Sequence, residues 1–179
     1  NQLVKPYRLA VGQSLFIDQG KYLRDTEMRI NGYSYPFISN YVLEQTLPYL
    51  TCLSVFSYGF SMVGKLIPPI LDDTWMIQKA RQYQAIPILT LTPLGPDGKF
   101  NNQLIHSVVN NEDYTYRLIY EMLDMVEKKN YGAVDIDFEY ILKEDRDAFT
   151  AFVRKTREVM NENGYEVSVA VAPKTSDTQ

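Results

Sequence analysis

The stretch "YGAVDIDFEY", residues 131–140, alternates acidic and apolar side chains. Its acids, Asp135, Asp137 and Glu139, stand at every second position, and apolar residues fill the positions between them. Successive side chains of a strand point to opposite faces, so the three acids share one face. Aspartate disfavours strands, and a buried charge is costly unless it is paired. The stretch therefore predicts a strand with one apolar face and one acidic face, and the acidic face is expected to be a functional site.

Further apolar runs on both sides of this stretch predict four more strands, at residues 28–37, 50–60, 85–95 and 166–174. Helical periodicity fills the gaps at residues 40–50, 72–84, 112–130 and 145–164. This alternation indicates an α/β protein with parallel βα units. No glycine-rich dinucleotide or phosphate loop follows any strand. Two architectures remain, an open doubly wound sheet and a (β/α)8 TIM barrel present as its first five strands and four helices.

Composition narrows the choice of function. The 179 residues carry a net charge of −4, which argues against nucleic acid as a partner, and no run of 18 apolar residues predicts a membrane span. The single cysteine, Cys52, lies in an apolar run, and the single histidine, His106, is expected in a loop. These counts support neither a disulfide framework nor a zinc site. No cofactor and no bound metal are expected.

The acidic face is the candidate active site. Neighbouring acids on one face of a strand lie about 6.6–7 Å apart, close enough for like charges to raise a carboxyl pKa. Glu139 comes last, at the end of the strand where barrel enzymes place their chemistry, and is the candidate general acid. Asp137 would support it, with Asp135 behind. Two alternatives are a divalent-metal site of a phosphohydrolase and acids with a structural role on an exposed edge strand.

"GAVDIDFE" resembles the D-x-x-D-x-D-x-E signature of glycoside hydrolase family 18, the chitinase family, which ends the fourth barrel strand. Gly132 stands in place of the first acid. The stretches "INGYSYPFI", "TLPYLTCLSVFSYGF", "ILTLTPLGPDGKF" and "VAVAPKTS" are similar to the spore-cortex-lytic N-acetylglucosaminidase branch of that family. The third strand departs from chitinases, because it carries "LTPLG" where they usually carry S-x-G-G.

The first residues resemble a different unit. "NQLVKPYRLAVGQSLFI", residues 1–17, is similar to the tail of a LysM peptidoglycan-binding repeat. The resemblance divides the chain into residues 1–17, a LysM-like tail or an N-terminal extension, and residues 18–179, the N-terminal part of a family 18 barrel. A chain with five of eight strands is expected to be inactive alone and to risk self-association through unpaired strand edges.

The resemblance implies substrate-assisted cleavage of N-acetylglucosamine linkages in a polysaccharide such as peptidoglycan. Glu139 would be the acid and base, Asp137 would orient the acetamido group, and Asp135 would tune Asp137. Side chains near strand ends are further candidates for sugar contact, namely Tyr33, Tyr58, Tyr140, Asn101 and Asn102. The implied location is outside the cell, in the wall or spore of a bacterium. A non-catalytic glycan-binding relative is the main alternative.

Overall fold

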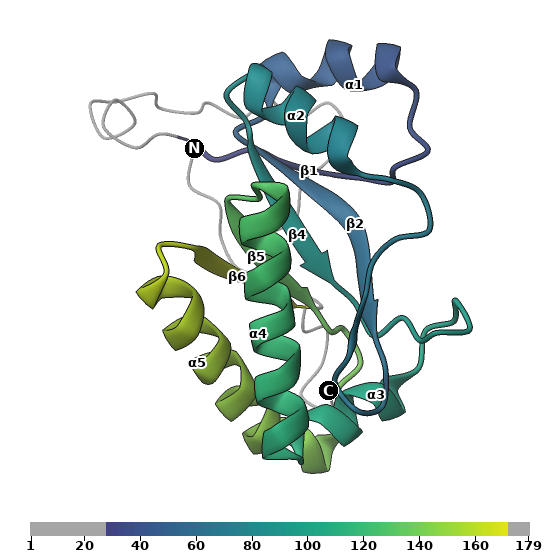
Figure 1. Cartoon of the computed structure of the whole chain (residues 1–179), viewed down its shortest axis with the longest axis vertical. Coiled ribbons are helices and arrows are strands. Elements are labelled where there is room, and N and C mark those ends of the chain that lie inside the picture. Colours follow the sequence, from purple (N-terminus) through teal and green to yellow (C-terminus); the bar gives the residue numbers. More distant parts are fainter. Residues whose placement is uncertain (1–27, 172–179) are drawn as a thin grey trace, which may run out of the picture.

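The computed structural model describes residues 28–171, and its centre is a twisted parallel sheet (Figure 1). The strands follow one another across it in the order β1-β2-β4-β5-β6. Their bounds are β1 Asn31–Ser34, β2 Cys52–Phe60, β4 Ile86–Leu91, β5 Ala133–Asp137 and β6 Glu166–Ala170, and the two-residue strand β3, Leu66–Ile67, pairs antiparallel with the end of β2. Spatial order thus equals chain order, whereas an open doubly wound sheet reverses its order at a switch point. The fold is part of a (β/α)8 barrel, as predicted.

Helices connect the strands and cover one face of the sheet, where α2, α4 and α5 lie in front of it (Figure 1). Their bounds are α1 Asn40–Thr46, α2 Thr74–Gln82, α3 Asn102–Val109, α4 Glu112–Lys129 and α5 Arg146–Glu162, with short 3-10 turns η2 at Leu47–Tyr49 and η3 at Lys143–Asp145. Four of the helices lie where helical periodicity predicted them. Within residues 28–171, no helix has both the length and the apolar character needed to cross a bilayer.

Helix α3 corrects two predictions. His106 was expected in a loop and lies in α3, and Asn102 was expected in a loop and is the first residue of that helix. Asn101 is the N-cap, because its side chain accepts a hydrogen bond from the backbone N–H of Gln103 at 2.9 Å. The helix is only eight residues long and is held by tertiary packing of Leu104, Ile105 and Val108, all buried.

The main core lies between the sheet and its helices. Apolar residues of the strands point outward into it, and the long helices supply residues at three- and four-residue spacing. The fully buried members include Val55, Leu89, Leu91, Val134, Ile136, Met76, Ile77, Leu118, Met122 and Val126. Strand β5 is central, between β4 and β6. An exposed edge strand, the structural alternative for its acids, is therefore wrong.

The opposite, inner face of the sheet curls until its two edges meet. Arg29, just before β1, forms an ion pair with Glu166, the first residue of β6, at 2.5 Å. Further along the strands, the Tyr33 hydroxyl of β1 donates to Asp135 of β5 at 2.9 Å. Both contacts cross from the first strand to the far side of the sheet. The curvature of a barrel wall is therefore already present in these strands.

Candidate active site

The three acids of the opening stretch occupy different environments. Asp135 is buried within β5, Asp137 is half-buried at its last residue, and Glu139 is exposed two residues beyond the strand. The strand is thus shorter than predicted, because the ladder with β6 ends at the pair Asp137–Ala170. Glu139 lies in an irregular segment where its backbone is free of the sheet. Only Asp135 and Asp137 are fixed by the ladder.

Asp137 and Glu139 open into one cavity of about 330 Å³ at the carboxyl ends of the strands. Its other walls are Phe56, Pro93, Phe100, Asn102 and Tyr140. Phe56 belongs to β2, Pro93 follows β4 and Asn102 begins α3. The cavity therefore lies at the carboxyl ends of β4 and β5, beside Phe56 of β2, at the face that carries the chemistry in barrel enzymes.

The environment of Asp137 favours its protonated form. Burial raises the pKa of Asp137, and the charges of Glu139 and Asp135 raise it further. Its Oδ1 is buried and has no hydrogen-bond partner among residues 28–171. A buried acceptor without a partner is costly, and a donor on a bound molecule would relieve that cost.

This perturbation gives a stability prediction. In the unfolded chain, the Asp137 carboxyl ionises at about pH 3.9. Its pKa is raised in the folded state, so folded Asp137 keeps its proton to a higher pH. Ionised Asp137 therefore opposes folding above the folded pKa, and the opposition vanishes below the unfolded pKa. Asp137→Asn is expected to raise the thermal midpoint at pH 7 and to lose that advantage as the pH falls through the carboxyl range.

The matched control is Asp147→Asn, since Asp147 is an exposed aspartate on α5 that pairs only with the neighbouring Arg146. Thermal unfolding between pH 3 and pH 8 measures the difference between the two variants. A lower midpoint for Asp137→Asn at pH 7, or a gain that stays constant across this range, would contradict the prediction.

Asp135 and Tyr33 form a hydrogen-bonded pair beneath that cavity. The Asp135 carboxylate accepts from Tyr33 and, at 2.6 Å, from the Ser168 hydroxyl of β6. Burial raises the pKa of the Tyr33 phenol, and the hydrogen bond to Asp135 raises it further. Both residues line a second, deeper cavity of about 350 Å³ on the inner face. Tyr33 thus contacts the acid behind Asp137, and it is absent from the walls of the upper cavity.

Tyr58 is not placed for sugar contact. It is fully buried, its hydroxyl donates to Asp73 at 2.6 Å, and its ring lies edge-on to Tyr131. The reason is an irregularity in β2, whose register with β4 shifts between Val55 and Tyr58. The shift reverses the inside-outside alternation and turns Tyr58 to the helix-covered face. The expectation that Tyr58 faces a subsite is corrected accordingly.

Of the remaining candidates, two line the upper cavity and one does not. Tyr140 lines the upper cavity and is 72% exposed, so its ring is available to a ligand. Asn101 does not line the cavity, since its side chain caps α3, whereas its neighbour Asn102 does. Of the residues proposed from sequence, the structure brings Asp137, Glu139, Tyr140 and Asn102 together.

Aromatic residues that sequence reasoning missed complete the site. Phe56 and Phe100 line the cavity, and Phe100 is 62% exposed. Tyr35 lies edge-on to Phe56, with ring centroids 5.0 Å apart, and stacks on the exposed Phe37 at 4.9 Å. Phe56 shares the inner face of β2, so strand alternation carried a signal for it. Phe100 follows the turn sequence "GPDGK", and only the fold shows which way that loop returns.

Gly132 occupies the position of the missing first acid. A Cβ atom there would lie 2.6 Å from Ile86 Cγ2 and 3.2 Å from Arg81 Nη2. The Ile86 methyl group sits on a branched Cβ, which restricts its rotation and keeps it from moving aside. The space for a side chain at 132 is therefore filled by its neighbour. Asp135 is instead hydrogen-bonded by Tyr33 and Ser168.

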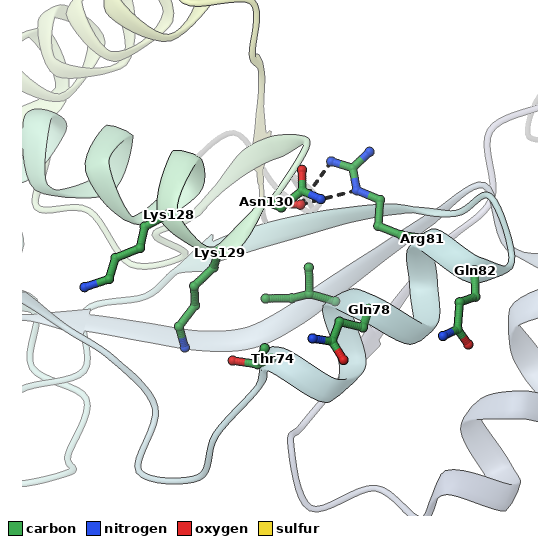
Figure 2. A pocket seen from close by; sticks show the side chains of 8 residues that line it. Thr74, Gln78, Arg81, Gln82, Lys128, Lys129 and Asn130 are labelled. Carbon is green, nitrogen blue, oxygen red and sulfur yellow. Dashed lines mark hydrogen bonds between the residues drawn. The ribbon is translucent and has the colours of Figure 1, made fainter.

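A larger cleft of about 810 Å³ lies elsewhere, between α2 and the end of α4 (Figure 2). Two of the cations that line it, Arg81 and Lys129, have structural roles. Arg81 donates to the backbone carbonyl of Asn130, which follows α4 in a left-handed conformation, and Lys129 bonds to the buried Asp73. No acid lines this cleft. It lacks the acid–base pair that the cavity of Asp137 and Glu139 contains.

Metal ligation finds no support in the geometry. Across residues 28–171, no three or more histidine, cysteine or acidic side chains converge as a metal ion requires. The alternating acids of β5 are spread over the length of the strand instead of gathering around one point. The D-x-D metal alternative therefore has no assembled ligand set in this part of the chain.

No model of a known protein family matches the sequence. Several curated proteins are nevertheless similar to it in sequence. YdhD of Bacillus subtilis, described as a sporulation-specific glycosylase, is 33% identical over 142 residues, which cover 79% of this chain and 33% of YdhD. The cortical fragment-lytic enzyme of Bacillus subtilis is 32% identical over 132 residues, covering 74% of this chain and 30% of the enzyme. The chain is a homologue of these spore proteins. It spans about a third of their length.

Solved structures agree on the fold. The spore cortex-lytic enzyme SleL of Bacillus megaterium superimposes with a TM-score of 0.77 and 25% identity, over 84% of this chain and 36% of SleL. A class V chitinase from Pseudomonas fluorescens superimposes with a TM-score of 0.78 over 84% of this chain and 47% of the chitinase. At 20% identity, that second similarity shows the fold alone. The LysM-like residues 1–17 lie outside the described residues.

Proposed function

We propose that this chain is the N-terminal part of a family 18 glycosidase that cleaves N-acetylglucosamine linkages in peptidoglycan of the spore cortex or cell wall. The observation that carries the proposal is the shared cavity of Asp137 and Glu139 at the strand ends. Homology to a cortical fragment-lytic enzyme supports the substrate class. The protein would act outside the cell or in the spore, consistent with those relatives.

The mechanism follows from the different environments of the two acids. Glu139, exposed and on an irregular segment, would donate its proton to the glycosidic oxygen as the bond to the anomeric carbon breaks. Asp137 Oδ1, buried and without a partner in the described residues, would accept the acetamido N–H of the same sugar. That contact turns the acetamido oxygen toward the anomeric carbon, where it forms an oxazolinium ring. Water then opens the ring and returns a proton to Glu139, with retention of configuration.

Aromatic side chains would hold the glycan in place. Phe100 and Tyr140 expose their rings at the cavity, and Tyr35 and Phe37 continue this surface beyond Phe56. Sugar rings have apolar faces that pack against such side chains. Among the cavity walls, the Asn102 amide and the Tyr140 hydroxyl could each hydrogen-bond a sugar hydroxyl.

The test uses the whole protein that carries this chain and two soluble glycans that differ only in N-acetylation. We expect release of reducing ends from the acetylated glycan, a first product with retained configuration by NMR, and release from the deacetylated glycan only at a slow background rate. A chelator should change nothing. Residues 1–179 alone should be inactive, because residues 28–171 supply five of the eight parallel strands of such a barrel. Binding without release would instead indicate a glycan-binding relative, and loss of activity with the chelator would indicate metal-dependent chemistry.

A further inference from the structure

Asp145 is a buried acid that the proposed mechanism does not use. It is 1% exposed and ends the segment that begins after β5. It also occupies the N-cap position of α5, where an aspartate usually accepts from the first backbone N–H groups of the helix. Here its side chain makes no such bond. The carboxylate is directed to another element.

That element is α3. The Nδ1 of His106 lies 2.8 Å and 3.0 Å from the two carboxylate oxygens of Asp145 and donates to them. Asn110, one turn further along, donates from Nδ2 to Asp145 Oδ1 at 2.7 Å. His106 of α3 and Asn110, the C-cap residue of that helix, therefore hold one buried carboxylate. Hydrogen bonds to a charged acceptor are stronger than neutral ones, and burial makes their loss costly.

The two elements joined in this way both supply walls of the cavity. Helix α3 begins at Asn102, and the segment that ends at Asp145 carries Glu139 and Tyr140. Helix α3 is itself well anchored, because Leu104, Ile105 and Val108 are buried. Asp145 thus attaches the Glu139 segment to a fixed helix.

The other end of the segment is also fixed. Phe138 is buried and packs on Phe60, Phe149 and Phe152, with ring centroids 5.5–6.0 Å apart. Glu139 lies between this aromatic anchor and the polar anchor at Asp145. The Glu139 side chain is exposed.

We infer that His106, Asn110 and Asp145 form a positioning cluster that holds the Glu139 segment at the distance from Asn102 that the reaction requires. The inference rests on the proposed function and adds to it residues that touch neither sugar nor cavity. Releasing Asp145 from α3 leaves the segment held by the buried Phe138 and by the half-buried Ile141, which packs against the main core. Glu139 then samples positions away from the glycosidic oxygen. Displacements of about 1 Å in an active site can lower turnover by about 10²-fold.

The test is His106→Ala in the whole protein, with two comparison variants. His106→Asn keeps a nitrogen donor at the branch position of Nδ1 and should rescue. Tyr131→Phe is the matched control, because it removes a 2.6 Å hydrogen bond to the buried carboxylate of Asp73, and neither residue lines the cavity. We expect kcat to fall about tenfold to hundredfold in His106→Ala with KM changed less than about threefold. His106→Asn should recover most of kcat, and Tyr131→Phe should lower only the thermal midpoint.

Amide hydrogen exchange gives a readout that needs no turnover. Exchange at residues 139–144 should accelerate in His106→Ala, remain near wild type in His106→Asn, and be unchanged in Tyr131→Phe. Unchanged exchange and kcat in His106→Ala would overturn the inference, as would an equal loss of kcat in Tyr131→Phe. If the wild type cleaves no glycan, the proposed function fails. The exchange rates of residues 139–144 in His106→Ala and in the wild type then still show whether the cluster holds this segment.

Discussion

Replacing Glu139 with glutamine is expected to reduce turnover by about 10²–10⁴-fold while glycan binding persists. Glutamine keeps the size of the side chain and its ability to hydrogen-bond, but it has no proton to give to a leaving oxygen. Because Glu139 is exposed and lies beyond β5, the exchange disturbs neither the core nor the sheet. The measurements are kcat on an N-acetylated glycan and calorimetric binding of the same glycan.

The matched control for this experiment is Glu144→Gln. Glu144 is exposed in the same connecting segment but does not line the cavity. Its replacement should leave kcat unchanged. Turnover by Glu139→Gln within a few-fold of the wild type would remove Glu139 from the role of general acid, and loss of binding in the same variant would point to a role in holding substrate.

Replacing Asp137 with alanine is expected to lower turnover of the N-acetylated glycan by about 10²–10³-fold, the effect of removing one preorganised group from a developing charge. Without its carboxylate, the acetamido group is no longer oriented and the oxazolinium charge is no longer balanced. The loss should depend on the substrate. A deacetylated glycan cannot form the ring, so Asp137→Ala should change its slow background rate little.

This substrate dependence separates assistance from general damage to the site. The quantity to measure is the ratio of rates on acetylated and deacetylated glycans, which should collapse in Asp137→Ala and stay constant in Asp147→Ala. Asp147 is a suitable control because it is exposed and distant from the cavity walls. An unaltered ratio in Asp137→Ala would exclude this role for Asp137.

Strand alternation predicted the part of the site that depends on local geometry. Asp135 and Asp137 share the inner face of β5, and the succession of apolar runs and amphipathic helices predicted the order of strands and four of the helices. These features follow from periods of two and of 3.6 residues, which are properties of the chain itself. The end of the strand was less predictable, because the ladder with β6 stops at Asp137 and frees Glu139.

What could not be predicted depends on distant contacts. The register shift in β2 turned Tyr58 away from the inner face, and no local pattern in "VFSYGF" marks it. Helix α3 is short and bounded by asparagines at both ends, so its apolar residues resembled a loop with scattered hydrophobic positions. His106 consequently became a partner of Asp145, 39 positions away, only once both helices were in place.

Gly132 and Ile86 together restrict how this site can change over evolutionary time. Since the Ile86 methyl group fills the space of a side chain at 132, an acid cannot be acquired there by one substitution without collision. A smaller residue at 86 would have to come first, and it would leave a void until the second change arrived. Intermediates on either route carry a steric clash or a void, so lineages that carry isoleucine at this position are expected to retain glycine beside it.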